Sequence, residues 1–406
     1  MPPSTKVSSP PSLRSIWHQD TLSLAREQLS ERDESILATQ IEVSEIAAPT
    51  GEESERGAWI ARRLARLGLE DVRTDGVGNV IARRTGTSDT APVVVCAHLD
   101  TVFPRDVCVK VRREGSRLVG PGIGDNGRGL AALLALAAAI DARRIRTVAP
   151  VDFVATVGEE GAGDLRGAKH LFGESHSAAT AAIALDGAGD ERIVHRALGS
   201  RRYRITYRGI GGHSWSAFGV PHPVHATAVA AAKLARIALP TEPRTTLSVG
   251  RIGGGLSVNA IPDEGWLEVD VRSTATANLD RVERELRAVA RAAETEENDR
   301  RQRGTPALSV AIAVIGDRPT GETPEGHPLV VAALDATRLI GREPELTTAS
   351  TDANVPISLG IPAIALGGGG RGGDAHTSTE WFENAEGRLG LARALGAVVA
   401  TAGLSD

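Results

Sequence analysis

The stretch VVVCAHLD (residues 93–100) ends a run of β-branched residues on His98 and then Asp100. Such a run predicts a buried strand with two polar side chains at its carboxyl end. Three further apolar runs lead to side chains of the same kinds: Glu159 and Glu160 after 151–157, Asp186 after 181–185, and His376 after IPAIAL and a glycine-rich loop. Helical patterns alternate with these runs, which predicts an α/β fold with a mostly parallel sheet covered on both faces.

A fifth side chain of this type is Asp125, in the glycine-rich turn GPGIGDNGRG (residues 120–129) ahead of an apolar helix expected at 127–140. Taken singly, each of these residues has an ordinary structural explanation; an Asp before a helix, for example, is usually an N-cap. Their repeated occurrence at strand ends points instead to one site, because parallel strands present their carboxyl ends at one edge of the sheet.

Imidazole nitrogens and carboxylate oxygens are the donors that zinc accepts, and a catalytic site leaves a position open for water or substrate. Two ions about 3.5 to 4 Å apart can share a bridging carboxylate. We expect Asp125 to be that bridge. The balanced distribution of the rest places His98 and Asp186 on one ion, and Glu160 and His376 on the other.

Glu159 is left without a metal in this scheme. Peptide hydrolysis needs a carboxylate that takes a proton from the attacking water and returns it to the leaving nitrogen, and Glu159 fits that role. Asp100, two residues beyond His98 on the same face of an extended strand, can orient that imidazole. The alternative is that Asp100 is itself a ligand.

The motifs together resemble the co-catalytic zinc metallopeptidases and deacylases, which include glutamate carboxypeptidase, tripeptide aminopeptidase, aminoacylase and succinyl-diaminopimelate desuccinylase. The resemblance spans about residues 36–403. It rests on HLDTVFP (98–104), GPGIGDNGRG (120–129), GEEGAGDLRGAK (158–169), ALDG (184–187) and AHTSTEW (375–381). It implies two Zn²⁺ per chain, with Co²⁺ or Mn²⁺ as substitutes, and the same roles for the ligands and for Glu159.

The resemblance also implies an inserted lid domain, and the β-α-β-β-α order after Gly199 is typical of a small α+β sandwich. By resemblance, His213 of GIGGHSW reaches the partner subunit's active site in a homodimer and stabilises the oxyanion. Asn259 and Arg272 match lid positions that hold polar groups or carboxylates of the substrate. For His213 a bond to a neighbouring carbonyl, and for Arg272 a strand-end ion pair, are the structural alternatives.

These patterns divide the chain into a catalytic di-zinc domain of residues 15–198 and 311–406 and a lid and dimerisation domain of residues 199–310. Residues 1–14, rich in Pro and Ser, are expected to be a disordered leader without the apolar core of an export signal. Within the catalytic domain, helices are expected at 33–48, 53–67, 328–339 and 386–402.

The 406 residues carry a formal charge of −5, which gives no reason to expect binding to nucleic acid or to an anionic membrane. The two cysteines form no disulfide framework, and we expect a cytoplasmic protein.

The leading functional hypothesis is hydrolysis of short peptides, as by an aminopeptidase or a di- or tripeptidase, because Asp186 in ALDG resembles the peptidase branches. A deacylase of N-acyl amino acids or a carboxypeptidase of the same family is the alternative. A metal-stabilised binding protein without activity is the remote one.

Overall fold

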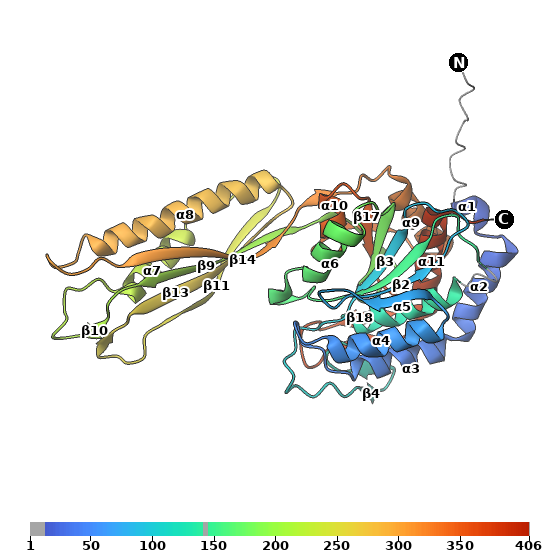
Figure 1. Ribbon diagram of the computed structural model, residues 1–406, viewed down its shortest axis with the longest axis horizontal. Helices are drawn as coiled ribbons and strands as arrows, with labels where there is room; N and C mark the ends of the chain where they lie inside the picture. Colours follow the sequence, from blue (N-terminus) through green and yellow to red (C-terminus); the bar gives the residue numbers. More distant parts are fainter. Residues whose placement is uncertain (1–12, 141–144, 406) are drawn as a thin grey trace, which may run out of the picture. The chain divides into compact units, whose positions relative to one another are not determined.

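The structure, a computed structural model, describes residues 13–140 and 145–405. The chain forms two compact units (Figure 1). The larger consists of the described residues before Leu198 together with those from Glu322 onward, and the smaller spans Leu198–Gly321. The larger unit is therefore built from two separate parts of the chain.

A nine-stranded sheet forms the centre of the larger unit within the described residues, in the order β1-β2-β6-β3-β7-β17-β8-β15, with β16 beside β8. Its strands are β1 (Glu70–Thr74), β2 (Val80–Arg84), β3 (Val93–His98), β6 (Val151–Thr156), β7 (Ala181–Leu185), β8 (Arg192–Ala197), β15 (Gly321–Glu322), β16 (Glu345–Ala349) and β17 (Ala363–Leu366). The four central strands β6, β3, β7 and β17 are parallel to one another, which confirms the expected fold class.

Helices cover both faces of this sheet (Figure 1). One face packs against α1 (Leu13–Ile16), α2 (Asp20–Glu31), α3 (Asp33–Ser44), α4 (Ser54–Arg66), α5 (Gly127–Ala139), α9 (Pro328–Leu339) and α11 (Gly387–Ala402); the other packs against α6 (Arg166–His170) and α10 (Asn354–Ser358). Along β3, Val93 and Val95 join the first core while Val94 and Cys96 join the second, as the two-residue period of a strand requires. No helix among the described residues combines the length and the apolar character needed to cross a bilayer.

A second sheet of the larger unit, in the order β18-β19-β5-β4, joins segments that are far apart in the sequence. It consists of β4 (Arg112–Glu114), β5 (Arg117–Val119), β18 (Arg371–Gly373) and β19 (Trp381–Glu383). The antiparallel pairing of β5 with β19 sets Val119 opposite Trp381. The turn that follows β5 and the loop between β18 and β19 therefore lie next to each other.

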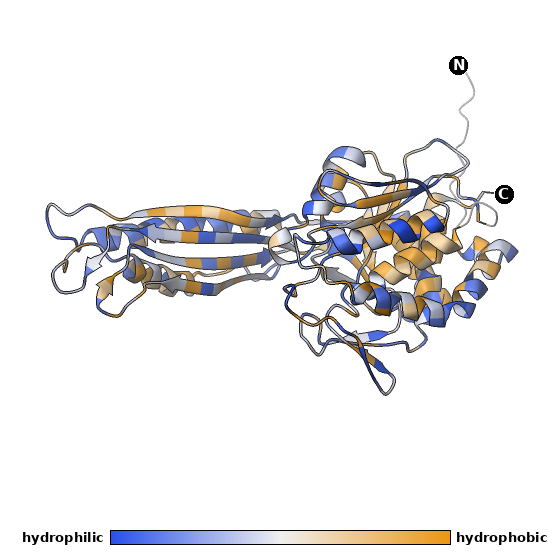
Figure 2. Cartoon of the chain, turned by 60° about the horizontal axis from the view of Figure 1, so that its bottom comes forward, coloured by the Kyte–Doolittle hydropathy of each residue, from blue (hydrophilic) through white to orange (hydrophobic). Residues whose placement is uncertain are grey.

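The smaller unit is an antiparallel sheet with two helices packed on it. Its strands run in the order β11 (Thr245–Gly254), β13 (Glu264–Ser273), β9 (Gly199–Arg208) and β14 (Ser309–Arg318); its helices are α7 (Pro223–Leu234) and α8 (Thr276–Asn298); a short pair is formed by β10 (Gly212–His213) and β12 (Ala260–Ile261). Burial alternates strictly along β13, with Leu267, Val269 and Val271 facing the helices. Figure 2 shows the same alternation as bands of hydrophobic and hydrophilic colour along these strands.

Two expected boundaries differ from those observed. The expected boundary at residue 311 falls inside β14, which pairs with β9 from Ser309 opposite Arg208 to Arg318 opposite Ser200. An alternating strand can complete either sheet, so its pattern alone did not assign it. Most of the expected leader lies in residues 1–12, outside the described residues, whereas Leu13 and Arg14 already belong to α1.

Candidate active site

The polar side chains expected at strand ends meet at one edge of the larger sheet. His98 is the last residue of β3 and lies in register with Thr156, the last residue of β6. Glu159 and Glu160 follow β6 after a short turn, and Asp186 directly follows β7. Because these strands are parallel neighbours, their ends deliver all four side chains to the same place.

Asp125 lies between two imidazoles. Its Oδ1 is 3.0 Å from His98 Nε2, and its Oδ2 is 3.2 Å from His376 Nε2. The turn after β5 supplies Asp125, and the loop between β18 and β19 supplies His376, so the small second sheet brings the two together. His376 has a φ of 66°, a strained value for a residue other than glycine and one that occurs preferentially at functional sites.

The remaining contacts divide the five side chains into two groups around Asp125. His376 Nε2 lies 2.9 Å from Glu160 Oε1. His98 Nε2 lies 3.9 Å from Asp186 Oδ1. The structure thus brings together all five residues that the sequence suggested as ligands.

The electrostatics of this cluster suit a divalent cation. Hydrogen bonds with Asp125 and Glu160 raise the pKa of His376 to about 10. Burial raises the pKa of Asp186 to about 7, and the charge of Asp125 acts in the same direction. Three carboxylates around two imidazoles therefore stabilise added positive charge. Ligand atoms of His98, Asp125 and Glu160 all lie within 4.8 Å of one another, which is close enough to share an ion.

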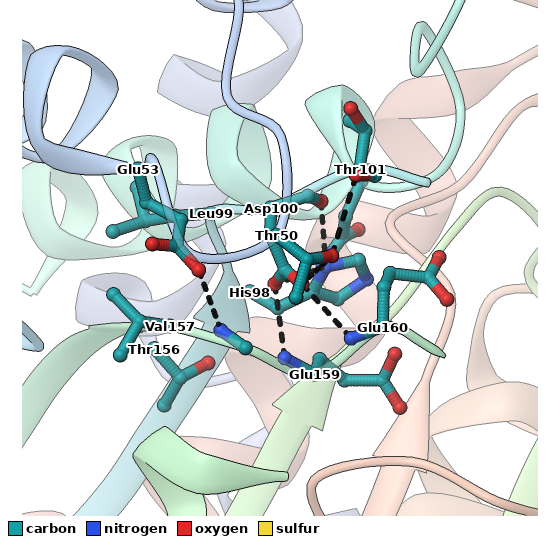
Figure 3. Close-up of polar contacts among 12 residues, drawn as sticks. Thr50, Glu53, His98, Leu99, Asp100, Thr101, Thr156, Val157, Glu159 and Glu160 are labelled. Carbon is teal, nitrogen blue, oxygen red and sulfur yellow. Dashed lines mark hydrogen bonds and ion pairs between the residues drawn. The ribbon is translucent and has the colours of Figure 1, made fainter. Parts of the chain in front are cut away.

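Asp100 holds the loop that carries Glu159 and Glu160. Its Oδ1 accepts the backbone N–H of Glu159 at 3.0 Å, and its Oδ2 accepts that of Glu160 at 2.9 Å (Figure 3). The Nδ1 of His98 lies 3.1 Å from the main-chain oxygen of Asp100 and 3.6 Å from its carboxylate. A bond from Nδ1–H to that carbonyl leaves Nε2 free to bind a metal. With both carboxylate oxygens bound to backbone amides, the geometry favours an orienting role for Asp100 over a ligand role.

Comparison with known proteins agrees with this arrangement. The sequence profile of peptidase family M20/M25/M40 matches residues 94–400. The chain is a member of this family. The assignment makes the protein a metallopeptidase-type hydrolase that acts on amide bonds.

Individual M20 relatives extend the match along the chain. The uncharacterised YqjE protein of Bacillus subtilis is 27% identical over 353 residues, which cover 82% of this chain and 90% of the relative. Succinyl-diaminopimelate desuccinylase of Corynebacterium glutamicum is 26% identical over 334 residues, or 80% and 86% of the two chains. Among solved structures, aminopeptidase PepT of Bacillus cereus superimposes with a TM-score of 0.71 at 24% identity and covers 91% of this chain and 98% of PepT. A Staphylococcus aureus tripeptidase gives 0.73 at 24%, with 90% and 98% covered. At these identities the structural matches show the shared fold.

Glu380 contacts the turn that carries Asp125 and was not among the residues expected from the sequence. Its carboxylate is buried and accepts the backbone N–H groups of Gly122 at 2.9 Å, Gly124 at 2.7 Å and Asp125 at 2.7 Å. Burial raises the pKa of Glu380 to about 7, although these hydrogen bonds act against the rise. The sequence shows a carboxylate four residues after His376 in AHTSTEW, but it does not indicate which backbone groups this carboxylate bonds.

A groove of about 820 Å³ adjoins Asp125 and Asp186 within the larger unit of this M20 protein. Glycine-rich segments line it, at residues 187–189 and 370–373, together with Arg192, Arg371 and Trp381. Its volume is in the range of small-molecule binding sites.

The three residues expected to act from the lid lie in the smaller unit. His213, in β10, is exposed, and its Nδ1 accepts the backbone N–H of Trp215 at 3.1 Å. Asn259 is exposed beside Ser257. Arg272, in β13, forms an ion pair with Asp270 at 2.6 Å. The strand-end pairing considered for Arg272 is therefore present, and its guanidinium remains partly exposed.

Proposed function

We propose that this M20 protein is a di-zinc peptidase that cleaves short peptides, with Glu159 as the general base. The observation that carries the proposal is the carboxylate of Asp125 between His98 and His376, because a site for two ions needs one ligand that both can share. His98 with Asp186, and His376 with Glu160, would complete the two sets of ligands. Two bound divalent ions would supply Lewis-acid activation of water and of the scissile carbonyl.

The residues around the ligands would then perform the proton transfers. Glu159 is buried beside Glu160, and its backbone is held by Asp100. We assign it to take a proton from the attacking water and to deliver a proton to the leaving nitrogen when the amide bond breaks. General base catalysis of this kind contributes about 10²- to 10⁴-fold to a rate.

The smaller unit is proposed to act as a lid and dimerisation domain. His213 would donate a hydrogen bond to the oxyanion that develops on the scissile carbonyl, from the partner subunit. Arg272 would bind a substrate carboxylate, for which a guanidinium offers paired donors, and Asn259 would bind a polar group. The exposed positions of His213 and Asn259, and the partly exposed Arg272, are compatible with these roles.

A deacylase of N-acyl amino acids is the second candidate, because one relative at 26% identity is a desuccinylase. Two features support the peptidase instead: Asp186 at its ligand position, and the fold shared with PepT and the tripeptidase. The two candidates differ in the substrate group they require. An aminopeptidase needs a free α-amine, whereas a deacylase needs that nitrogen acylated.

A mixed panel of di- and tripeptides and N-acyl amino acids, incubated with zinc-loaded protein and followed by mass spectrometry, separates them. The proposal predicts cleavage of free-amine peptides and its loss in Glu159→Ala. Cleavage confined to acylated substrates would assign the protein to the deacylases. If Glu159→Ala kept full activity, Glu159 would not be the general base. No cleavage of any substrate would favour a binding protein.

A further inference from the structure

Three consecutive amides of the loop after β6 face two buried carboxylates. The N–H of Gly158 donates to Glu53 Oε1 at 3.1 Å, and those of Glu159 and Glu160 donate to the two oxygens of Asp100 at 3.0 and 2.9 Å (Figure 3). Glu53 is only 4% exposed and Asp100 is 0% exposed. A buried N–H that lost such an acceptor would be left without a partner, so these bonds are costly to break.

Both carboxylates are held by the turn that precedes α4. The hydroxyl of Thr50 donates to Asp100 Oδ2 at 2.9 Å, and the N–H of Gly51 donates to Glu53 Oε1 at 2.8 Å. Arg166 adds a hydrogen bond from its guanidinium to Glu53 at 3.2 Å. The turn therefore connects to the loop through two routes: Thr50 acts through Asp100, and Glu53 acts directly.

The turn is itself fixed to the end of β3. The backbone N–H of Thr101 donates to Ala48 O at 2.9 Å, next to the bridge between Pro49 and Thr101. In α4, the fully buried guanidinium of Arg56 donates to Leu99 O at 2.7 Å. The turn and the strand end that carries the His98 imidazole thus form one rigid support for the loop.

Glu53 and the reacting groups occupy opposite sides of this loop. Figure 3 shows the side chains of Glu159 and Glu160 extending away from Glu53. Glu53 contacts only the backbone of Gly158 and Gly51 and the side chain of Arg166 in the bonds described. Its contacts therefore act on where the loop lies, through the backbone of Gly158.

We infer that Thr50 and Glu53 are positioning residues for the proposed base Glu159 and the proposed ligand Glu160. This inference rests on the function proposed above for those two side chains. Catalytic groups must be held to within about 0.5 Å of their productive geometry. Replacing a residue that hydrogen-bonds to a metal ligand and orients it typically lowers metal affinity or activity by about 10- to 100-fold.

The test compares Thr50→Val and Glu53→Gln with Glu52→Gln as the matched control. Val keeps the shape of Thr but cannot donate to Asp100, and Gln keeps the shape of Glu while removing the charge. Glu52 is the neighbour of Glu53 in the same turn, but it is exposed and pairs with Arg105. Three quantities are measured: kcat and KM on a cleaved peptide, zinc affinity by chelator competition, and amide hydrogen exchange of the peptide containing residues 157–161 in metal-free protein.

We expect each of the two variants to lower kcat or zinc affinity about 10- to 100-fold, with KM nearly unchanged and exchange at 158–160 faster. The control should match the parent in all three measurements. Parent-like exchange in both variants overturns the inference, even if activity falls, because the loop would then not depend on these contacts. Unchanged kcat and unchanged zinc affinity in both variants would also overturn the inference.

If one variant does not fold, the other decides by the same criteria. Amide hydrogen exchange does not depend on turnover, so it tests this inference separately from the proposed function. If the role assigned to Glu159 is wrong, the Glu159→Ala protein remains active; if this inference is wrong, hydrogen exchange in the variants matches the parent.

Discussion

The carboxylate of Glu380 accepts the backbone N–H of Asp125 at 2.7 Å, across 255 positions of sequence. The same carboxylate accepts the N–H groups of Gly122 and Gly124, so it fixes the turn that presents Asp125 to both imidazoles. The residue at the centre of the site is therefore located by a side chain that contacts neither His98 nor His376 in the bonds described.

Replacement of Glu380 should weaken metal binding. In Glu380→Gln one oxygen becomes an amide group that cannot accept, which leaves at least one buried N–H of the turn without a partner. We expect zinc affinity to fall roughly 10- to 100-fold and the free energy of unfolding to fall by about 1–3 kcal/mol. Chelator competition and urea unfolding measure the two effects. Glu322→Gln, at an exposed carboxylate paired with Arg196, is the control, and equal zinc affinities for the two variants would contradict this role.

Asp152, a buried carboxylate in β6, should make stability depend on pH. Asp152 Oδ1 is 2.7 Å from Arg83 Nε, and its Oδ2 is 2.8 Å from His176 Nε2. Burial acts to raise the pKa of Asp152, but these hydrogen bonds outweigh it and the pKa is lowered. A carboxyl whose pKa is lower in the folded protein stabilises the fold above its unfolded pKa of about 4, and this contribution is lost as the pH falls through the folded pKa.

Asp152→Asn should therefore lower the free energy of unfolding by about 1–3 kcal/mol at neutral pH, and by progressively less below about pH 4. Urea unfolding of both proteins at pH 7, 5 and 3.5 measures this difference. Asp89→Asn, at an exposed carboxylate, should show no comparable effect. A penalty for Asp152→Asn that stays the same at all three pH values would show that the charge of Asp152 is not responsible.

The strand-end ligands could be predicted from the sequence because each follows an apolar run whose period and length indicate a buried strand. Helix α9 (Pro328–Leu339) was predicted at its observed bounds, since proline at the first turn marks its start. The supports of the site were not predictable in this way. Thr50 bonds the Asp100 carboxylate, and Glu53 and Glu380 accept from the backbone amides of Gly158 and Asp125. Each of these partners lies 50 or more residues away in the sequence, and such contacts leave no spacing pattern.

The residue at which the smaller unit ends could also not be predicted from the sequence pattern. Residues 309–318 have the alternation of a strand that could lie at the edge of either sheet, and only the pairing of nine of these residues with β9 assigns them to the smaller unit. The roles expected for His213, Asn259 and Arg272 remain predictions, because each depends on contacts with a substrate or a second subunit.

Subunit mixing tests whether His213 acts across a dimer. His213→Ala and Glu159→Ala should each be nearly inactive alone. In a mixed dimer, one site would combine an intact Glu159 with an intact His213 from the other subunit. Equal mixing should therefore restore roughly a quarter of the parent activity, since half of the dimers are mixed and each has one complete site. An absence of recovery, with exchange of subunits shown independently by native mass spectrometry of tagged chains, would rule out action in trans.

The central claim is that Glu159 transfers the proton while other residues hold the ions. The most direct measurement is kcat on a cleaved free-amine peptide for the parent and Glu159→Gln, each loaded to the same measured zinc content. We expect kcat of Glu159→Gln to be lower by roughly 10²- to 10⁴-fold at unchanged zinc content. Equal kcat values at equal zinc content would contradict it.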